Sequence, residues 1–339
     1  MNNILVSVII PCRNEEKFIH YCLDSIVFQS YPKDKLEVLV VDGMSEDKTR
    51  EMVKDYSLKH VFVKLLDNPE KTTPYALNIG IKNAKGSIVM KMDAHTIYDK
   101  EYISQCVFNL EKYKVDNVGG VLEAVPFKNT LVARAIAKSL GSRFGVGSCF
   151  KLGTQKPKKV DAVAFGCFRK ALFSKIGYYN TNMIRSQDIE LNSRIKKQGG
   201  KIVLVPEIKA YYYPSPDIKS FFRHNLKDGL WVFYPLKFSI RAFSFRHLIP
   251  FFFIFSIISL VLLSFFFRFF LWILALEIIL YFLSSFYFSA VICKKEKDIR
   301  FFFLLPLIFL ARHTGYGLGS IAGLIWIFAS KKKQASTIK

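Results

Sequence analysis

The chain lacks both glycine patterns that most often cradle a nucleotide, G-x-G-x-x-G and the P-loop. Any nucleotide is therefore expected to be held in another way. The six cysteines show no paired rhythm and no zinc-type spacing, which is typical of a reduced, cytosolic setting. An apolar strand begins after three residues, with no basic n-region or cleavage site before it. We therefore expect no signal peptide and a first domain that stays in the cytoplasm.

Acidic residues are scarce. The 27 Asp and Glu face 49 Lys and Arg, which gives a net charge of +22. Such a balance indicates an anionic partner: nucleic acid, an acidic lipid surface or a phosphorylated substrate. Hydrophobic residues make up 51% of the chain, and the apolar excess lies mainly after residue 247. Because long apolar stretches follow the charged part, we favour a membrane surface and nucleotide phosphates, and expect no nucleic acid partner.

Strands and helices alternate through the first third of the chain. Apolar runs at 6–10, 36–41, 61–66 and 88–92 are typical of buried strands, and helical segments separate them. Alternation at this pitch predicts an α/β domain with a Rossmann-like, mostly parallel, doubly wound sheet. Pro11 is expected to end the first strand, because proline cannot continue a central ladder. From about residue 117 the alternation loosens.

Two aspartates end strands of this sheet, Asp42 after the second and Asp93 after the fourth. Right-handed crossovers bring both to one edge, where open α/β sheets bind ligands. Asp93 and His95 are two residues apart, so in extended chain they point the same way and could hold one cation. Oxygen ligands with one imidazole suit Mn²⁺ or Mg²⁺. On these residues alone, each aspartate could instead cap the segment that follows it, and His95 could be an ordinary surface residue.

Five motifs, in order, resemble the inverting, nucleotide-sugar-dependent glycosyltransferases of family 2, which have the GT-A fold. They are V-S-V-I-I-P-C-R-N-E-E (6–16), V-V-D-G-M-S-E-D-K-T (40–49), A-L-N-I-G (76–80), M-D-A-H (92–95) and Q-D-I-E-L-N-S-R (187–194). The D-A-H variant and the apolar C-terminal part are similar to the succinoglycan-type glucosyltransferase subgroup, which elongates lipid-linked exopolysaccharide. The resemblance covers the chain to about residue 230.

This resemblance implies a donor site and a metal site. Pro11, Arg13 and Glu15 would line the pocket for the base and ribose of a UDP-sugar, and Asp42 would contact the uracil-type base. Asp93 and His95 would match the metal-binding D-x-D motif. The donor-binding residues would be Pro11, Arg13, Glu15, Asp42 and Asp93. A divalent cation, Mn²⁺ or Mg²⁺, would then be the cofactor.

The resemblance also implies that Asp188 is the catalytic base, which deprotonates the acceptor hydroxyl. Two residues depart from the commonest family pattern. His95 stands in place of a second Asp, which leaves the identity of the metal open. Gln187 stands in place of the usual Glu and gives Asp188 a neutral neighbour. Residues 221–231 lie where processive synthases carry Q-x-x-R-W, but they match only at Trp231, so they do not predict processivity.

Residues 248–292 are almost wholly apolar and are interrupted only by Arg268 and Glu277. At about 20 residues a span, this length suits two crossings with a turn near 264–268. The basic residues at 294–297 indicate the cytoplasmic side. Residues 301–330 are apolar but contain Pro306 and several glycines. A third straight crossing would place the lysines at 331–333 outside, so we expect a re-entrant or interfacial helix pair instead.

Four regions are therefore predicted. They are a GT-A glycosyltransferase domain (1–217), an amphipathic interfacial collar (218–247), a membrane region (248–330) and a basic cytoplasmic tail (331–339). The basic side chains of the collar, interleaved with aromatic residues, suit lipid headgroups. They are Lys219, Arg223, Lys227, Lys237, Arg241 and Arg246. The expected location is the inner (cytoplasmic) membrane, multi-pass, with the catalytic domain in the cytoplasm.

Three functions remain open on the sequence. The leading one is an inverting transfer of a sugar from a UDP-sugar to a lipid-linked oligosaccharide or a growing exopolysaccharide or cell-surface glycan. An alternative is a polyprenyl-phosphate glycosyltransferase, whose phosphate acceptor needs no base. The third is a membrane-anchored GT-A scaffold that has lost catalysis. The presence of Asp42, Asp93 and Asp188 argues against the scaffold.

Overall fold

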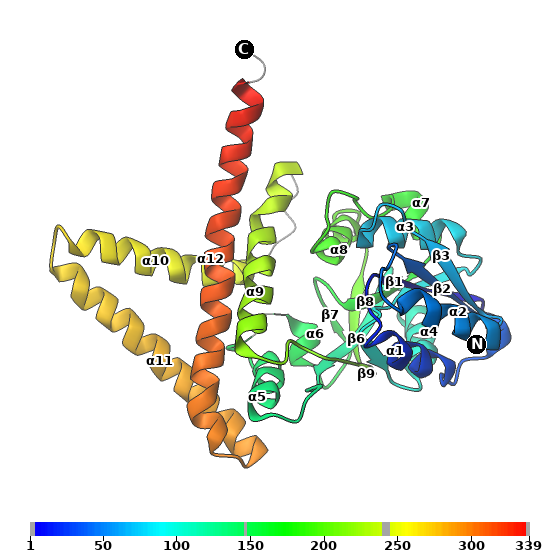
Figure 1. The fold of residues 1–339 in the computed structure, drawn as a ribbon, viewed down its shortest axis with the longest axis horizontal. Coiled ribbons are helices and arrows are strands. Elements are labelled where there is room, and N and C mark those ends of the chain that lie inside the picture. Colours follow the sequence, from blue (N-terminus) through cyan, green and yellow to red (C-terminus); the bar gives the residue numbers. More distant parts are fainter. Residues whose placement is uncertain (1–3, 146–147, 239–244, 337–339) are drawn as a thin grey trace. The chain divides into compact units, whose positions relative to one another are not determined.

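The computed structural model describes residues 4–145, 148–238 and 245–336 (Figure 1). The chain divides into two compact units. The first unit consists of Met1–Glu123 with Cys149–Tyr212, and the second of Ala124–Ser148 with Tyr213–Lys339. Arg241 of the expected collar lies outside the described residues, as do residues 337–339 of the expected tail.

The first unit is built on a nine-stranded sheet with the order β3-β2-β1-β4-β8-β6-β9-β5, in which β7 also pairs with β9. The first four strands are parallel, as the sequence predicted. They are β1 (Val6–Cys12), β2 (Leu36–Asp42), β3 (Val63–Asp67) and β4 (Ile88–Lys91). The helices connecting them are α1 (Ile19–Val27), α2 (Thr49–Lys59) and α3 (Thr73–Asn83), and a short 3₁₀ turn, η1 (Lys33–Lys35), precedes β2.

The second half of the sheet is antiparallel, where the sequence predicted a mostly parallel arrangement. β8 runs antiparallel to both β4 and β6, and β9 runs antiparallel to both β5 and β7. A parallel pair needs a long crossover between its strands, and the alternation that supplies crossovers stops near residue 117. The strands are β5 (Thr96–Tyr98), β6 (Asn117–Ala124), β7 (Lys158–Lys159), β8 (Ala164–Arg169) and β9 (Ile202–Tyr212). The helices are α4 (Tyr102–Tyr113), α6 (Cys149–Leu152), α7 (Leu172–Ile176) and α8 (Gln187–Lys197).

Helices cover both faces of the sheet, so alternate residues of one strand enter different cores. Val8 and Ile10 of β1 pack with Leu23 of α1 on one face. Ile9 packs with Leu77 of α3 on the other face. This burial on both faces explains why most residues of the central strands are apolar, with no polar face that alternates with an apolar one.

Pro11 does not end β1, contrary to the sequence-based expectation. The strand continues to Cys12, and Pro11 pairs with Val41 of β2. On its other side β1 pairs with β4 only over Val6–Ile9. The proline, which has no N–H to donate, therefore lies where the second ladder has already finished, and the strand tolerates it.

The second unit is helical. Its helices are α5 (Leu131–Leu140), α9 (Ile218–Phe233), α10 (Ile249–Ser264), α11 (Phe269–Glu296) and α12 (Arg300–Ser336), with 3₁₀ turns η2 (Tyr234–Phe238) and η3 (Phe245–His247). Among the described residues, α11 and residues 300–327 of α12 are long and apolar enough to cross a membrane, with mean hydropathies of 2.1 and 1.4. α10 has 16 residues, fewer than the roughly 20 of a full crossing.

Residues 300–336 form one helix, not the re-entrant or interfacial pair that the sequence predicted. The glycines that suggested an interruption are instead points of close packing. A Cβ atom at Gly319 would lie 2.1 Å from the carbonyl oxygen of Leu226 on α9. A Cβ atom at Gly229 of α9 would lie 2.0 Å from the carbonyl oxygen of Tyr316. Small residues spaced along two helices allow their backbones to approach closely. The glycines of α12 therefore serve helix packing and do not interrupt the helix.

Candidate active site

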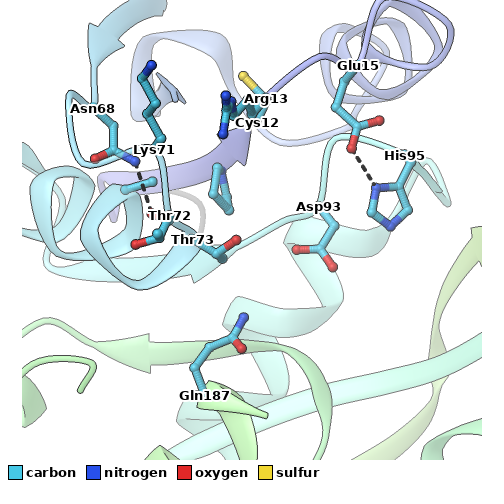
Figure 2. Close-up of a pocket in the computed structure, with 12 residues that line it drawn as sticks. Cys12, Arg13, Glu15, Asn68, Lys71, Thr72, Thr73, Asp93, His95 and Gln187 are labelled. Atoms are coloured by element: carbon cyan, nitrogen blue, oxygen red, sulfur yellow. Dashed lines mark hydrogen bonds and ion pairs between the residues drawn. The ribbon is translucent and has the colours of Figure 1, made fainter. Parts of the chain in front are cut away.

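A cavity of about 220 Å³ lies in the first unit, where the loops after β1, β3 and β4 meet (Figure 2). Most of the predicted donor and metal residues contribute to its wall, and Gln187, the neighbour of Asp188, also does. Its lining residues are Pro11, Cys12, Arg13, Glu15, Asn68, Lys71, Thr72, Thr73, Ala76, Asp93, His95 and Gln187. Residues that the sequence predicted at one edge of the sheet thus lie in one cavity. The fold brings together lining residues that range from position 11 to position 187 in the chain.

Asp93 lies just beyond β4 with its main chain fixed and its carboxylate partly open. Its N–H donates to the hydroxyl oxygen of Tyr98 at 2.6 Å, and its carbonyl oxygen accepts from the thiol of Cys22 at 3.5 Å. The side chain is 27% exposed. In Figure 2 the carboxylate stands on the cavity wall beside His95. This arrangement holds a negative group rigidly against the cavity.

His95 pairs with Glu15 across the cavity wall, with 3.2 Å between Nδ1 and Oε1 (Figure 2). Burial by itself would lower the pKa of His95. The hydrogen bond to Glu15 and the negative charges of Asp93 and Glu15 outweigh it, and the pKa is raised. A carboxylate on one imidazole nitrogen orients the ring and leaves the other nitrogen for a ligand. Glu15 is thus placed to orient His95 as well as to line the cavity.

The donor set fits a divalent cation that takes its other ligands from a substrate. Across the described residues, no group of three or more His, Cys, Asp or Glu side chains is arranged to hold a metal ion. Asp93 and His95 supply one carboxylate and one imidazole to the same cavity. Mg²⁺ and similar ions are commonly held by one or two protein ligands together with phosphates and water. The cavity is therefore suited to a metal that arrives with a diphosphate.

Asp188 lies in the first turn of α8, as the sequence predicted, and its side chain is 30% exposed. Its Oδ2 is 2.5 Å from the Nζ atom of Lys91, and that Nζ is 3.5 Å from Oδ1 of Asp93. Burial raises the pKa of Asp188, and the Lys91 ammonium opposes the rise. Burial would lower the pKa of Lys91, but Asp188 and Asp93 raise it above its ordinary value. A carboxylate with a raised pKa is a stronger base near neutral pH.

Side-chain hydrogen bonds hold α8, and with it Asp188, against the rest of the first unit. Asn117 of β6 donates its Nδ2 to Oδ1 of Asn192 at 2.7 Å, and both residues are buried. Arg194 donates to the carbonyl oxygens of Ile176, Gly177 and Tyr178 at 2.5, 3.1 and 2.8 Å. These bonds fix the position of α8, and with it the position of Asp188, within the first unit.

Asp42 does not line the cavity. Its side chain is fully buried, and its carboxylate accepts hydrogen bonds at 2.6 Å from Nη1 of Arg50 and at 2.5 and 2.9 Å from the hydroxyl and N–H of Ser45. Arg50 also pairs with Asp67 at 2.7 Å. Asp42 therefore stabilises the turn behind the cavity in this structure, and base contact through it stays a prediction.

Sequence reasoning missed Lys91 and the loop after β3. Lys91 could have been found as a charged residue that ends an apolar strand two positions before Asp93, on the same side of the extended chain. The loop contributes Lys71, whose φ is +59°, together with Asn68 and Thr72. Oδ1 of Asn68 and Oγ1 of Thr72 are buried without a hydrogen-bond partner among the described side chains. No sequence pattern indicated these unpaired polar atoms.

Known proteins are similar to this chain over the part that contains the cavity. Residues 7–176 match the family described as Glycosyl transferase family 2. A Methanococcus voltae enzyme, dolichyl N-acetyl-α-D-glucosaminyl phosphate 3-β-D-2,3-diacetamido-2,3-dideoxy-β-D-glucuronosyltransferase, is 29% identical over 268 residues, which are 76% of this chain and 81% of that protein. The succinoglycan biosynthesis protein ExoA of Rhizobium meliloti is 24% identical over 253 residues, 70% of this chain and 76% of that one.

A solved structure has the same fold over nearly the whole chain. The mannosyltransferase PcManGT from Pyrobaculum calidifontis, in complex with GDP-Man and Mn²⁺, superposes with a TM-score of 0.60. The match covers 95% of this chain and 87% of that chain at 19% sequence identity. The likeness therefore extends past the sheet into the helical second unit.

Proposed function

This chain belongs to glycosyl transferase family 2, and from that premise we propose that it transfers a sugar from a UDP-sugar, with inversion, to a lipid-linked oligosaccharide or a growing exopolysaccharide or cell-surface glycan. The family and the GT-A fold expected from the sequence are confirmed. The observation that carries the finer proposal is the cavity that joins Glu15, Asp93 and His95 to the start of the helix bearing Asp188.

For the donor, we assign the base and ribose to the part of the cavity lined by Pro11, Arg13 and Glu15. Lys71 and the unpaired Asn68 Oδ1 and Thr72 Oγ1 border the same cavity and supply further polar groups. Buried polar atoms without partners favour a ligand that satisfies them. Asp42 would reach the base only if Arg50 or Ser45 released it, so we propose that it acts mainly through the turn it holds.

Asp93 and His95 would hold the divalent cation, with Glu15 orienting His95. When bound, such an ion neutralises the charge that develops on a departing diphosphate. The donor set of one carboxylate and one imidazole suits Mn²⁺ or Mg²⁺. Metal dependence is thus part of the proposal.

In the proposed reaction, the Asp188 carboxylate takes the proton from the acceptor hydroxyl as that oxygen attacks the anomeric carbon. The bond between the anomeric carbon and the diphosphate oxygen breaks on the opposite face, so the configuration inverts and UDP leaves. Asp188 suits this step because burial raises its pKa while α8 holds it in place. Arg13 and Glu15 would keep the donor oriented in the cavity.

For the acceptor, the M. voltae relative offers the most specific support, because its name describes transfer to dolichyl N-acetylglucosaminyl phosphate, a sugar on a lipid carrier. ExoA is named for biosynthesis of an exopolysaccharide, succinoglycan. The name of the M. voltae relative thus describes transfer onto a sugar rather than onto a bare lipid phosphate. A sugar hydroxyl also gives Asp188 a proton to remove, whereas a phosphate acceptor does not.

We propose that the second unit is a multi-pass anchor in the inner membrane, with the first unit in the cytoplasm. α10 and α11 would enter the membrane as a hairpin that turns near 264–268, and α9 and α12 would form the interfacial part. Lys138 of α5 pairs with Glu296 at 2.7 Å, and Arg134 with Asp298 at 3.7 Å. These pairs hold the basic loop after α11 beside α5, and we propose that this end of the second unit lies on the cytoplasmic side.

A nucleotide-release assay with the full chain in detergent tests the activity. The donors are a panel of UDP-sugars with GDP-mannose as a comparison, and the acceptors are native membranes, lipid-linked oligosaccharide and polyprenyl phosphate. We expect UDP release that depends on a sugar-bearing acceptor. Equal release with polyprenyl phosphate would favour the alternative acceptor, and no release with any donor would contradict the proposal.

Single-cysteine labelling tests the anchor. A cysteine in the 264–268 turn should react with a membrane-impermeant reagent from outside the cell. Cysteines near residue 297 and at 331–333 should react only after the cells are opened. Labelling of the 331–333 region from outside would show instead that α12 crosses the membrane.

A further inference from the structure

Lys91 is a buried cation at the centre of the first unit, between two carboxylates. It ends β4, and its side chain is only 5% exposed. Its Nζ atom is 2.5 Å from Asp188 and 3.5 Å from Asp93. Lysine is rarely this buried unless it is paired. Lys91 is not among the residues that line the cavity, so it acts through the residues it touches.

The surroundings of Lys91 fix its amine in this place. The strand is paired on both sides, and Lys91 itself lies opposite Ile9 of β1. The ring of Phe165 lies 5.9 Å from Nζ. Phe165 has a φ of +49° inside β8, a left-handed conformation that is costly for a bulky residue. Tyr102 donates its hydroxyl to the carbonyl oxygen of Phe165 at 3.3 Å. The backbone that carries this ring is held by the hydrogen bond from Tyr102.

We propose that Lys91 is a positioning residue that couples the metal-binding carboxylate Asp93 to the base Asp188, by competing with the metal ion for Asp93. The inference rests on the proposed function. It adds a link between Asp93, which would bind the metal and the donor, and Asp188, which would act on the acceptor. The sequence places Asp188 97 residues beyond Lys91 in the chain, so only the folded sheet makes this contact.

The physical basis is one positive charge shared by two negative ones. Without a metal, the Lys91 ammonium attracts both carboxylates and fixes their separation. A divalent cation held by Asp93 would repel the ammonium, so the interaction of Lys91 would shift toward Asp188. Binding of the metal with the donor therefore strengthens the hold on the base. Conversely, Lys91 weakens the affinity of the empty site for a free metal ion.

The first experiment measures Mn²⁺ binding to the full chain in detergent, without donor, from the electron paramagnetic resonance signal of free Mn²⁺. Lys91→Met should tighten binding about tenfold, because a competing charge next to Asp93 is removed. Asp188→Asn should weaken it, because Lys91 then turns wholly to Asp93. In the Lys91→Met background, Asp188→Asn should have a smaller effect than in the wild type. That non-additivity is the signature of coupling through Lys91.

Lys64→Met is the matched control. Lys64 lies on β3 of the same sheet, pairs with Glu37 at 3.1 Å and does not line the cavity. The substitution removes the same charge from an ion pair, so it should leave Mn²⁺ affinity within about twofold. An equal tightening in Lys64→Met would mean that net charge alone sets the affinity, and would overturn the inference.

The second experiment measures turnover with saturating donor and metal. Lys91→Met should lower kcat about 10²-fold, because Asp188 loses the partner that positions it. Lys91→Arg keeps the charge and should recover most of kcat and the wild-type Mn²⁺ affinity, which also guards against a folding defect in the methionine variant. Turnover and Mn²⁺ affinity that both stay at the wild-type values in folded Lys91→Met would overturn the inference.

Failure of the inference is distinct from failure of the proposed function. Wild-type protein that neither binds Mn²⁺ nor releases UDP would contradict the proposed function and the inference built on it. If the wild-type protein binds Mn²⁺ and releases UDP, and the Lys91 variants have the same Mn²⁺ affinity and turnover as the wild type, only the inference is contradicted.

Discussion

Asp42 and Asp93 have the same place in the sequence pattern, at the end of a strand, but one side chain is buried and the other is partly exposed to a cavity. Each stands at or just beyond the C-terminal end of a parallel strand, β2 or β4. Asp42 is fully buried, and Arg50 and Ser45 occupy its oxygens. Asp93 is 27% exposed on the cavity wall, with Lys91 as its side-chain partner at 3.5 Å. A carboxylate whose oxygens are saturated by the protein stabilises the fold, whereas one with free oxygens can bind a ligand.

The largest effect is expected from removal of the metal, which should affect the site at Asp93 and leave the surroundings of Asp42 unchanged. EDTA should abolish sugar transfer, and added Mn²⁺ or Mg²⁺ should restore it, because the cation that Asp93 and His95 would hold neutralises the charge on the departing diphosphate. UDP release measured before and after chelation checks this. Circular dichroism of the same samples should show that the fold is retained, since Asp42 and its partners need no metal. Undiminished UDP release in EDTA would remove the metal from the proposal.

Asp188→Asn should leave the fold intact and lower turnover by roughly 10²–10⁴, because the variant cannot accept the acceptor proton. Asn has nearly the same shape as Asp, so if Asp188 served only to start α8, the variant should keep nearly full activity. Donor affinity and kcat measured on this variant separate the two roles. In the wild type, the base must be ionised, so turnover should fall as the pH drops. Burial raises the pKa of Asp188, so that fall should begin above the ordinary range of aspartate.

Arg50→Met should destabilise the fold, because it leaves the carboxylate of Asp42 buried without its ion pair. Losing one partner of a buried pair costs about 3–5 kcal/mol, and the remaining bonds from Ser45 place the loss in free energy of unfolding near the lower value. Thermal melting measures the loss. Arg13→Met is the control on the same edge, because its pair with Glu46 is exposed and 3.6 Å long. That change should cost less than about 1 kcal/mol. Equal melting temperatures for the two variants would contradict the contrast.

The smallest expected effect concerns His95. His95→Asp should keep more activity than His95→Ala, because an oxygen ligand can replace the imidazole in a site for Mn²⁺ or Mg²⁺. The apparent Mn²⁺ affinity of the two variants, measured by titrating turnover, checks the ranking. The aspartate would lie near Glu15 and Asp93, so we expect partial rather than full recovery. Equal activity in both variants would mean that His95 is not a ligand.

The sequence by itself determined the parallel half of the sheet and the helix α8 that carries Asp188 in its first turn. It also predicted part of the cavity wall, namely Pro11, Arg13, Glu15, Asp93 and His95. A short run such as 36–41, apolar except for Glu37, is typical of a strand buried on both faces, and the carboxyl ends of parallel strands meet at one edge of the sheet. The family motifs follow from the same local requirements. These features depend on neighbours in the chain, so a linear pattern can predict them.

Only the tertiary structure decided how each charged group is used. Whether Asp42 is closed depends on Arg50, and whether Asp188 is held depends on Lys91, 97 residues away along the chain. Gly319 of α12 is a point of close helix packing only because the backbone of Leu226 on α9 lies opposite it. Electrostatic and packing energies depend on distances between segments that are far apart in sequence. Those distances exist only in the folded chain, and for that reason no pattern of residues could give them.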